Sequence, residues 1–337
     1  MSTASIHDHL QAILGPIAYE QRSALCTSVL PSIIASLADI GKTLRAAHSV
    51  VAVGSTNAFG DEQLNVDVAA EQLVRAALAR CPSVATASSE EDPVERPVSH
   101  TVPVPKQQRE VYSVAFDPLD GSSIIGPGWA VGTIIGIWDG PSALGQAPPR
   151  TRQVAAVLAS YGSRNTALVA LRVPGAASPA ACFEVGLGDD GGAPTVVTRA
   201  EVRYRHEATT TGTRYFAPAN LRAASESPAY MALVQHYITE RYTLRYSGGL
   251  VPDVVHGLSK GHGLYVSPVA ARSRAKLRRL FELCPVAMVV ECAGGKAADA
   301  VDGSNVLDRA VEDINETGAL ACGNASEVDF ALQKLLT

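Results

Sequence analysis

The apolar stretch at residues 111–116 runs directly into Asp117-Pro118-Leu119-Asp120-Gly121-Ser122-Ser123, and this junction is the strongest local signal in the 337-residue sequence. The apolar run predicts a buried strand, and the Pro and Gly predict that a turn follows it. Asp117 and Asp120 can point at one centre, and hard oxygen ligands of this kind suit Mg²⁺. The segment Gly121-Ser122-Ser123 offers backbone N–H groups and hydroxyls to a phosphate. Taken alone, however, a D-x-x-D-G sequence is equally well explained as an Asx turn that caps a strand.

Two further acidic groups favour the metal site over the plain turn. Glu90 and Glu91 follow a predicted strand at residues 84–88, and Asp61 and Asp67 flank the start of the helix predicted before that strand. Read singly, each group is more often a solvated turn. If neighbouring strands bring the groups together, the mutual repulsion of the carboxylates is costly without divalent cations. The sequence therefore predicts a multi-metal phosphate site.

Cationic and amide side chains gather in the second half of the chain. The segments 242–249 and 276–279 hold Arg and Lys, and Asn220 and Arg222 precede them. Arginine grips a phosphate through two parallel hydrogen bonds, and lysine acts as a point charge. These residues are therefore candidates for binding an anionic substrate. Taken alone, residues 276–279 are better explained as a solvated run of charge at a helix end.

The composition argues against several classes of protein. The 33 acidic and 28 basic side chains give a net charge of −5, and no long basic run occurs, which is atypical of a nucleic-acid-binding protein. Apolar stretches such as residues 129–138 and 286–290 are far shorter than the ~20 residues that cross a bilayer. We therefore expect neither nucleic acid nor a membrane as a partner.

The cysteines and the chain ends bear on the cellular compartment. The six cysteines lie far apart without a C-x-x-C pair, which argues against a zinc site and is typical of buried thiols in a reducing compartment. The first eight residues have neither an apolar core nor an Arg-rich face, so no signal or transit peptide is predicted. We expect a cytoplasmic protein, with a plastid or a peroxisome-like organelle as the alternatives.

Helical and strand patterns predict the organisation of the chain. Apolar residues at three- and four-residue steps predict helices before residue 50 and from Pro228 onward, and Asp67 is the predicted N-cap of another helix. Short apolar runs predict strands at residues 131–138, 154–161, 166–173 and 196–204. We place a boundary near Arg199, between an acid-rich first subdomain (1–198) and a second subdomain (199–337) that holds most of the candidate cations.

Taken together, these motifs resemble those of the fructose-1,6-bisphosphatase and sedoheptulose-1,7-bisphosphatase family, within the Mg²⁺-dependent, lithium-sensitive sugar and inositol phosphatases. The resemblance extends from about Gly54 to the C-terminus. It rests on Gly54-Ser55-Thr56-Asn57 with Gly60-Asp61, on Ser89-Glu90-Glu91-Asp92, on residues 116–123, and on Lys276-Leu277-Arg278 followed by Leu280-Phe281-Glu282. It implies the fold of that family, which is a layered α-β-α-β-α sandwich of the α+β class with two subdomains.

The resemblance also implies a role for each residue of the site. The metal ligands would be Asp61, Glu90, Asp117, Asp120, Glu282 and the Leu119 carbonyl, which would hold two or three Mg²⁺ ions, with Mn²⁺ as a substitute. Asp67 and Glu91 would orient and deprotonate the attacking water. The scissile phosphate would lie on Gly121, Ser122 and Ser123, and the far phosphate and the sugar on Asn220, Arg245, Tyr246, Gly248 and Lys276.

Glu291 competes with Glu282 for the place of the last metal ligand. Both lie on a helix predicted at residues 282–292, and nine residues at ~100° each put them on opposite faces and ~13 Å apart, so only one of them can reach the site. Glu282 begins the predicted helix and also matches the family. We therefore expect Glu291 to be structural.

Within the family the sedoheptulose branch is closer. The matching segments are residues 132–138, Asn220-Leu221-Arg222-Ala223 and residues 242–253. Fructose enzymes place a sugar-binding Tyr shortly before the Lys-x-Arg, where this chain reads Tyr265-Val266-Ser267-Pro268. This departure weakens the interpretation as a fructose enzyme. The resemblance thus implies hydrolysis of the 1-phosphate of sedoheptulose 1,7-bisphosphate in carbohydrate metabolism (Calvin cycle or pentose phosphate pathway). A fructose-1,6- or dual-specificity bisphosphatase is the alternative, and an inactive sugar-phosphate sensor is the remote one.

The resemblance implies self-association as well. Family enzymes bring the Arg at the Arg245 position across a subunit interface, so a homodimer or homotetramer is expected, with a sugar bisphosphate as the substrate.

Overall fold

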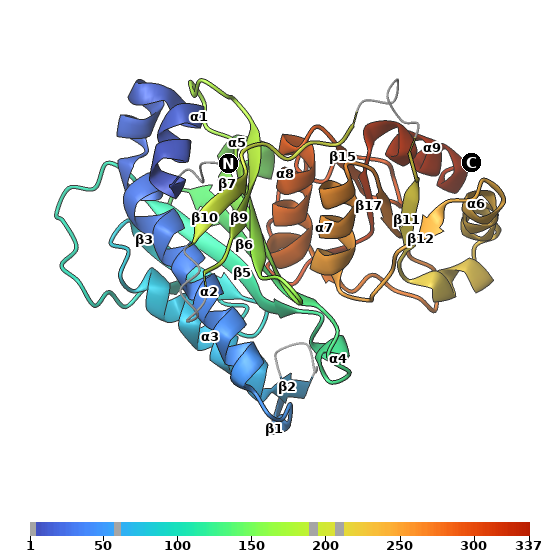
Figure 1. The fold of residues 1–337 in the computed structure, drawn as a ribbon, viewed down its shortest axis with the longest axis horizontal. Coiled ribbons are helices and arrows are strands. Elements are labelled where there is room, and N and C mark those ends of the chain that lie inside the picture. Colours follow the sequence, from blue (N-terminus) through green and yellow to red (C-terminus); the bar gives the residue numbers. More distant parts are fainter. Residues whose placement is uncertain (1–4, 57–61, 189–194, 206–211) are drawn as a thin grey trace.

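The computed structural model describes residues 5–56, 62–188, 195–205 and 212–337 of the chain. In this part of the molecule, layers of helix, sheet, helix, sheet and helix follow one another (Figure 1). The predicted α-β-α-β-α sandwich of the α+β class is therefore confirmed. The predicted boundary between residues 198 and 199 falls at the end of the last strand of the larger sheet and stays a prediction.

The larger sheet belongs to the first half of the chain. Its strand order is β10-β9-β8-β7-β6-β5-β3-β4, and of these neighbours only β3 and β5 pair in parallel. The strands are β3 (Val84–Ser89), β4 (Arg96–Pro97), β5 (Tyr112–Asp120), β6 (Val131–Asp139), β7 (Gln153–Tyr161), β8 (Thr166–Leu171), β9 (Ala181–Gly186) and β10 (Val196–Arg199). The central strands are buried along almost their whole length, which explains why they read as continuous runs of Val, Ile and Ala.

One face of this sheet is covered by the N-terminal helices (Figure 1). These are α1 (Ile6–Gln21), the π-helical η1 (Leu25–Val29), α2 (Leu30–Ala46) and α3 (Asn65–Leu78). Helix α3 begins two residues before Asp67, so the predicted N-cap at Asp67 was wrong. The N-cap is Leu64, and the Asp67 side chain accepts a hydrogen bond from the Leu64 N–H from inside the first turn.

The continuous helix formed by η1 and α2, Leu25–Ala46, is long and apolar enough to cross a membrane by length and composition. In the most apolar part of this helix 61% of the residues are buried inside the molecule. Leu30, Ile33 and Leu37 are fully buried in the core between the helices and the sheet. Packing within the protein therefore accounts for its apolar face.

The other face of the larger sheet packs on α7 (Leu250–Lys260), η4 (Arg279–Leu283) and α8 (Cys284–Cys292), which form the middle layer. The second sheet has the order β12-β11-β13-β17-β15. Its strands are β11 (Tyr215–Pro218), β12 (Thr243–Leu244), β13 (Leu264–Ser267), β15 (Lys296–Ala298) and β17 (Leu320–Gly323). Its outer face carries η3 (Leu221–Ser225), α6 (Pro228–Thr239) and α9 (Ala325–Leu335).

Short elements complete the described chain. These are β1 (Ala52–Thr56) with β2 (Glu62–Leu64), α4 (Ser122–Ile125), α5 (Pro149–Arg152), and β14 (Leu277–Arg278) with β16 (Thr317–Gly318). Because η4 and α7 lie against β5 and β6, side chains from both halves of the chain meet at the end of β5.

Candidate active site

Asp117 to Asp120 lie in a bulged strand and not in the predicted turn, which begins only at Gly121. Strand β5 continues to Asp120, and its pairing with β6 slips, because Asp117 faces Ile134 whereas Asp120 faces Gly132. Three steps along β5 against two along β6 leave one extra residue, which is a β-bulge. Pro118 suggested a turn because it cannot donate to a ladder, but a bulge tolerates proline for the same reason.

Three carboxylates, those of Asp117, Asp120 and Glu282, form a buried cluster at this bulge. One oxygen of each lies within 4.8 Å of the others, and the residues are 4, 7 and 6% exposed. Burial raises the pKa of Asp117 well above its ordinary value, and the charges of Glu90, Asp120 and Glu282 raise it further. Burial likewise raises the pKa of Asp120 to about 6 and that of Glu282 well above its usual range. Hard oxygen donors that repel one another fit a divalent cation.

The Asp120 carboxylate also caps α7. Its Oδ1 accepts a hydrogen bond from the Leu250 N–H at 3.0 Å, and its Oδ2 accepts one from the Val251 N–H at 2.6 Å. The positive end of the helix dipole lies here, so both contacts favour the anion. A Cβ on Gly132, the β6 partner of Asp120, would overlap the Val251 side chain. This glycine therefore lets α7 approach the sheet closely enough for the cap to form.

Glu282 lies within a π-helical segment, and the prediction that it begins the helix was wrong. The segment η4 starts at Arg279 and continues directly into α8. The Arg278 N–H donates to Glu282 Oε2 at 2.5 Å, which orients the carboxylate. Single π-turns of this kind are frequent at functional sites, and no residue pattern in the sequence announces one.

Glu291 lies outside the cluster and is neutralised by cations. Its Oε2 is 2.8 Å from Arg150 Nη1 and 2.7 Å from Arg172 Nη2, and Asn305 Nδ2 donates to its Oε1 at 2.7 Å. Burial tends to raise the pKa of Glu291, but the hydrogen bonds from Arg150 and Asn305 outweigh burial and lower it. These contacts tie α8 to α5, to the residue that follows β8 and to the loop that holds Asn305, which agrees with the structural interpretation of Glu291.

Glu90 borders the cluster from the end of β3. Its N–H donates to the Phe116 carbonyl at 3.0 Å, and its charge contributes to the raised pKa of Asp117 and of Glu282. Its Oε1 lies 3.9 Å from Arg278 Nε. Four of the predicted metal-binding side chains therefore converge on one volume.

Asp67 and Glu91 form a second acidic pair. Asp67 is 3% exposed, its Oδ2 accepts from the Leu64 N–H at 2.9 Å, and its buried Oδ1 has no partner among the described residues. Burial raises the pKa of Asp67 to about 7, and the charge of Glu91 adds to the effect. Gln63 Nε2 donates to Glu91 Oε2 at 2.5 Å. A carboxylate with a pKa near neutrality is suited to accept a proton. Asp61, the remaining predicted ligand, lies outside the described residues.

The sequence did not reveal what supports the end of β3. Ser89 Oγ donates to Glu71 Oε1 at 2.9 Å and accepts from the Asp92 N–H at 3.0 Å. Glu71 also pairs with Arg75 along α3, and Arg75 Nη2 lies 3.5 Å from Asp92. This network holds the turn that carries Glu90. The four-residue spacing of Glu71 and Arg75 could have predicted their ion pair, but such pairs are common on helix surfaces and do not indicate a site.

The predicted phosphate-binding residues follow the cluster directly. Gly121 has a φ of +86°, which favours glycine, and it precedes the short helix α4 that begins with Ser122 and Ser123. A Cβ on Gly121 would lie 3.4 Å from the Cα of Gly249. The turn that contains Gly248, a predicted sugar-binding residue, therefore packs next to the segment predicted to bind phosphate.

Asp253 on α7 holds that turn in place. Its Oδ1 accepts from the Ser247 N–H at 2.7 Å and its Oδ2 from the Gly248 N–H at 3.3 Å. Burial raises the pKa of Asp253 to about 6, although these hydrogen bonds act to lower it. Burial raises the pKa of Tyr246, a predicted sugar ligand, and the charge of the nearby Asp253 raises it further. Tyr246 is 44% exposed. The sequence predicted no role for Asp253.

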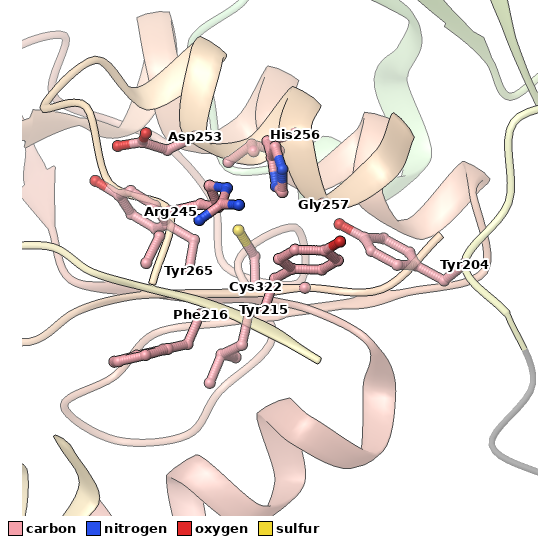
Figure 2. Close-up of a pocket in the computed structure, with 13 residues that line it drawn as sticks. Tyr204, Tyr215, Phe216, Arg245, Asp253, His256, Gly257, Tyr265 and Cys322 are labelled. Carbon is pink, nitrogen blue, oxygen red and sulfur yellow. The ribbon is translucent and has the colours of Figure 1, made fainter. Parts of the chain in front are cut away.

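Arg245 points into a small pocket within the second half of the chain. Figure 2 shows its guanidinium among Asp253 and His256 of α7 and Cys322 of β17. The guanidinium carbon is 5.8 Å from the centre of the Tyr215 ring. The pocket holds about 10 Å³, which leaves room for one water at most. A sugar phosphate therefore cannot enter this pocket, and no described contact joins Arg245 to the carboxylate cluster of its own chain.

Asn220 is hydrogen-bonded to the loop that ends at Lys276. Asn220 has a φ of +47°, and its Nδ2 donates to the carbonyls of Pro268 and Ser273 at 2.7 and 3.1 Å. Its N–H groups are therefore used by the backbone, and Oδ1 is the atom left for a ligand. Lys276 is exposed at the end of the same loop.

The charge run at residues 276–279 is only partly solvated. Arg279 is 2% exposed and donates to the carbonyls of Val306 and Arg309, both at 3.0 Å. The interpretation of residues 276–279 as a solvated run of charge therefore holds for Lys276 but not for Arg279, because a chain segment distant in sequence covers this arginine.

The raised pKa values predict how stability depends on pH when no divalent cation is bound. Folded Asp120 and Asp67 keep their protons up to about pH 6 and 7, whereas the unfolded chain releases them near 3.8. The folded state then binds more protons, so the free energy of unfolding falls as pH rises from about 4 to 7. Thermal melts in chelator should show this fall, and Mg²⁺ or Mn²⁺ should reverse it above pH 7.

The matched variant is Asp117→Asn, which removes one charge and keeps the acceptor for the Leu119 N–H, 2.9 Å from Asp117 Oδ1. In chelator it should become more stable relative to wild type as pH rises, and added cation should stabilise it less. Equal stabilisation of both proteins by the cation would contradict a metal site at this cluster.

Comparisons with known proteins agree with this geometry. The family model described as Fructose-1-6-bisphosphatase, N-terminal domain, matches residues 17–178, and the one described as Fructose-1-6-bisphosphatase, C-terminal domain, matches residues 209–335. The chloroplastic sedoheptulose-1,7-bisphosphatase of Triticum aestivum is 38% identical over 81% of this chain and 63% of its own. That of Spinacia oleracea is 37% identical over 87% of this chain and 70% of its own. This chain thus spans a little under two thirds of the wheat relative.

A crystal structure from Toxoplasma gondii, whose name includes the words sedoheptulose-1,7 bisphosphatase, has a TM-score of 0.84 to this structure and 33% sequence identity over 99% of each chain. The fold of fructose-1,6-bisphosphatase from Leishmania major also matches, with a TM-score of 0.80 at 23% identity over both complete chains. The family predicted from the motifs is thereby confirmed. The chain belongs to the fructose-1,6-bisphosphatase family.

Proposed function

We propose that this protein is a metal-dependent sugar bisphosphatase that hydrolyses the 1-phosphate of sedoheptulose 1,7-bisphosphate to sedoheptulose 7-phosphate and inorganic phosphate. The observation that carries the proposal is the buried cluster of Asp117, Asp120 and Glu282 directly before Gly121-Ser122-Ser123. Carboxylates and phosphate-binding groups on adjacent residues suit a cation that is bound together with a phosphate. The names of the wheat and spinach relatives support the sedoheptulose substrate.

A fructose bisphosphatase is the second candidate. Proteins named fructose-1,6-bisphosphatase class 1, for example from Syntrophotalea carbinolica and Geobacter sulfurreducens, are 33 and 31% identical to this chain. We rank this substrate second because the identity is lower. The chain also departs from the fructose enzymes at Tyr265-Val266-Ser267, the segment where they place a sugar-binding tyrosine shortly before the Lys-x-Arg.

Glu90, Asp117, Asp120 and Glu282, with the Leu119 carbonyl, would hold the divalent cation, for which we propose Mg²⁺ with Mn²⁺ as a substitute. When bound, such a cation polarises the phosphate and lowers the pKa of a water bound to it. The N–H of Arg278 and the first turn of α7 keep Glu282 and Asp120 oriented toward the cluster.

Asp67 and Glu91 would hold the attacking water and take its proton. The buried Oδ1 of Asp67 is a free acceptor among the described residues, and its pKa of about 7 suits proton transfer near neutral pH. Gln63 donates to Glu91 and so fixes the second carboxylate. The backbone and hydroxyls of residues 121–123 would hold the scissile phosphate.

The far phosphate would be held by Arg245, Lys276 and Tyr246, with Asn220 shaping the loop that carries Lys276. Because the exposed Arg245 side chain makes no described contact with the carboxylate cluster of its own chain, we propose that it serves the site of a second copy of the chain in a homodimer or homotetramer. Each complete site would then combine the carboxylate cluster of one copy with the cationic segment of the other.

The substrate is tested by steady-state kinetics with both sugar bisphosphates. We expect kcat/KM to be at least about tenfold higher for sedoheptulose 1,7-bisphosphate than for fructose 1,6-bisphosphate, because differential binding of one sugar is worth ~1–3 kcal/mol. Phosphate release should stop when the divalent cation is removed. Equal values would support a dual-specificity enzyme, and tight binding of either sugar without turnover would contradict the proposal.

The two competing glutamates give a matched pair of variants. Glu282→Gln should lower kcat/KM at least about 100-fold while the protein stays folded, because a cluster carboxylate is lost. Glu291→Gln should keep kcat within a few-fold and lower the free energy of unfolding by about 2 kcal/mol, because Arg150 and Arg172 lose their counter-charge. Activity assays and urea denaturation of both variants check this, and the reverse pattern would exchange the two assignments.

Mixed oligomers test the role of Arg245. Arg245→Ala and Asp117→Asn homo-oligomers should each have low activity at limiting substrate. Co-expressed chains should recover up to about a quarter of wild-type activity, since half of randomly formed dimers are mixed and each has one intact site. Mixing without recovery, in oligomers shown by mass spectrometry to be mixed, would mean that Arg245 serves its own chain.

A further inference from the structure

Two buried hydroxyls connect the bulge to the face of the larger sheet that the N-terminal helices cover. Thr133 Oγ1 donates to the Pro118 carbonyl at 2.8 Å, and Tyr161 Oη lies 2.9 Å from Thr133 Oγ1. Because the single proton of Thr133 is used on the carbonyl, Tyr161 is the donor in the second bond. The two residues are 0 and 4% exposed, so no bulk water competes for these bonds.

The bulge needs an external partner at this point. Thr133 lies between Gly132 and Ile134, the two β6 residues that pair with Asp120 and Asp117. The extra residue of β5 therefore lies opposite Thr133, where the ladder is interrupted. Pro118 has no N–H, and its buried carbonyl would be costly without a donor.

The two hydroxyls approach from the side away from the predicted substrate. Side chains alternate along a strand, and Ile134 belongs to the core with the middle layer whereas Ile135 and Tyr161 belong to the core under the N-terminal helices. Thr133 therefore shares the face of Tyr161. Glu282 reaches the cluster from the middle layer, so Thr133 can shape the cluster without touching what binds there.

We propose that Thr133, held by Tyr161, is a positioning residue for the metal cluster. By fixing the carbonyl between Asp117 and Leu119, it keeps the bulge in the shape that places the Asp117 and Asp120 carboxylates together. The proposal rests on the proposed function insofar as the cluster binds a divalent cation, and it assigns to two residues outside the cluster a share in that affinity.

The test measures Mn²⁺ binding to metal-free protein by titration calorimetry, with activity as a separate readout. Thr133→Val should raise the Kd for Mn²⁺ about 10–100-fold, the range for lost partners of metal ligands. Tyr161→Phe should shift it in the same direction by less, and Thr133→Ser should return it close to the wild-type value. The metal concentration for half-maximal activity should rise by the same factor in each variant, while KM for the sugar bisphosphate at saturating metal stays unchanged.

Thr86 supplies the matched control. Its Oγ1 donates to the Pro141 carbonyl at 2.7 Å, so the same chemical bond occurs in the same sheet away from the bulge. Thr86→Val should leave the Kd for Mn²⁺ unchanged even where it lowers the melting temperature.

The results of these measurements either support or overturn the positioning role of Thr133. Wild-type affinity in both Thr133→Val and Tyr161→Phe, or equal loss in Thr86→Val, would overturn the positioning role. If Thr133→Val does not fold, Tyr161→Phe still tests the role, because a wild-type Kd for Mn²⁺ in that variant would overturn it. Absence of Mn²⁺ binding by the wild-type protein would instead overturn the metal-dependent function itself.

Discussion

The repulsion among three buried carboxylates is the constraint around which this molecule is arranged. Asp117, Asp120 and Glu282 place oxygens within 4.8 Å of one another where water is excluded. Among the described residues, each of them accepts backbone N–H hydrogen bonds and none pairs directly with a cation. Asp117 receives the N–H of Leu119, Asp120 two N–H groups of α7, and Glu282 the N–H of Arg278. Backbone donors orient an anion yet leave lone pairs for a metal ion, which a tight ion pair would take up.

The same constraint joins the two halves of the chain. Asp120 belongs to the larger sheet but caps a helix that begins 130 residues later, and Glu282 comes from the middle layer. The cluster exists only when α7 and η4 are packed on β5 and β6. Binding of a cation would therefore stabilise the packing of the two halves, since anything that binds only the folded state stabilises it.

Two glutamates of one helical unit show how surroundings decide function. Glu291 has two arginines and an asparagine around it, and its pKa is lowered, so its charge is satisfied within the protein. Glu282 faces other acids, and its pKa is raised. A carboxylate that the protein leaves uncompensated is a candidate ligand, whereas a compensated one ties elements together.

The sequence by itself determined the family, the residues of the acidic cluster and the buried central strands, because these depend on local residue order and on the period of apolar side chains. Only the tertiary structure decided that Pro118 lies in a bulge, that Glu282 lies in a π-turn and that Arg279 is buried. It also decided that the Asn220 amide is used by the backbone and that Thr133 supports the bulge. The bulge, the burial of Arg279 and the hydrogen bonds of Asn220 and Thr133 depend on contacts between separate segments of the chain, whose energies the local pattern does not contain.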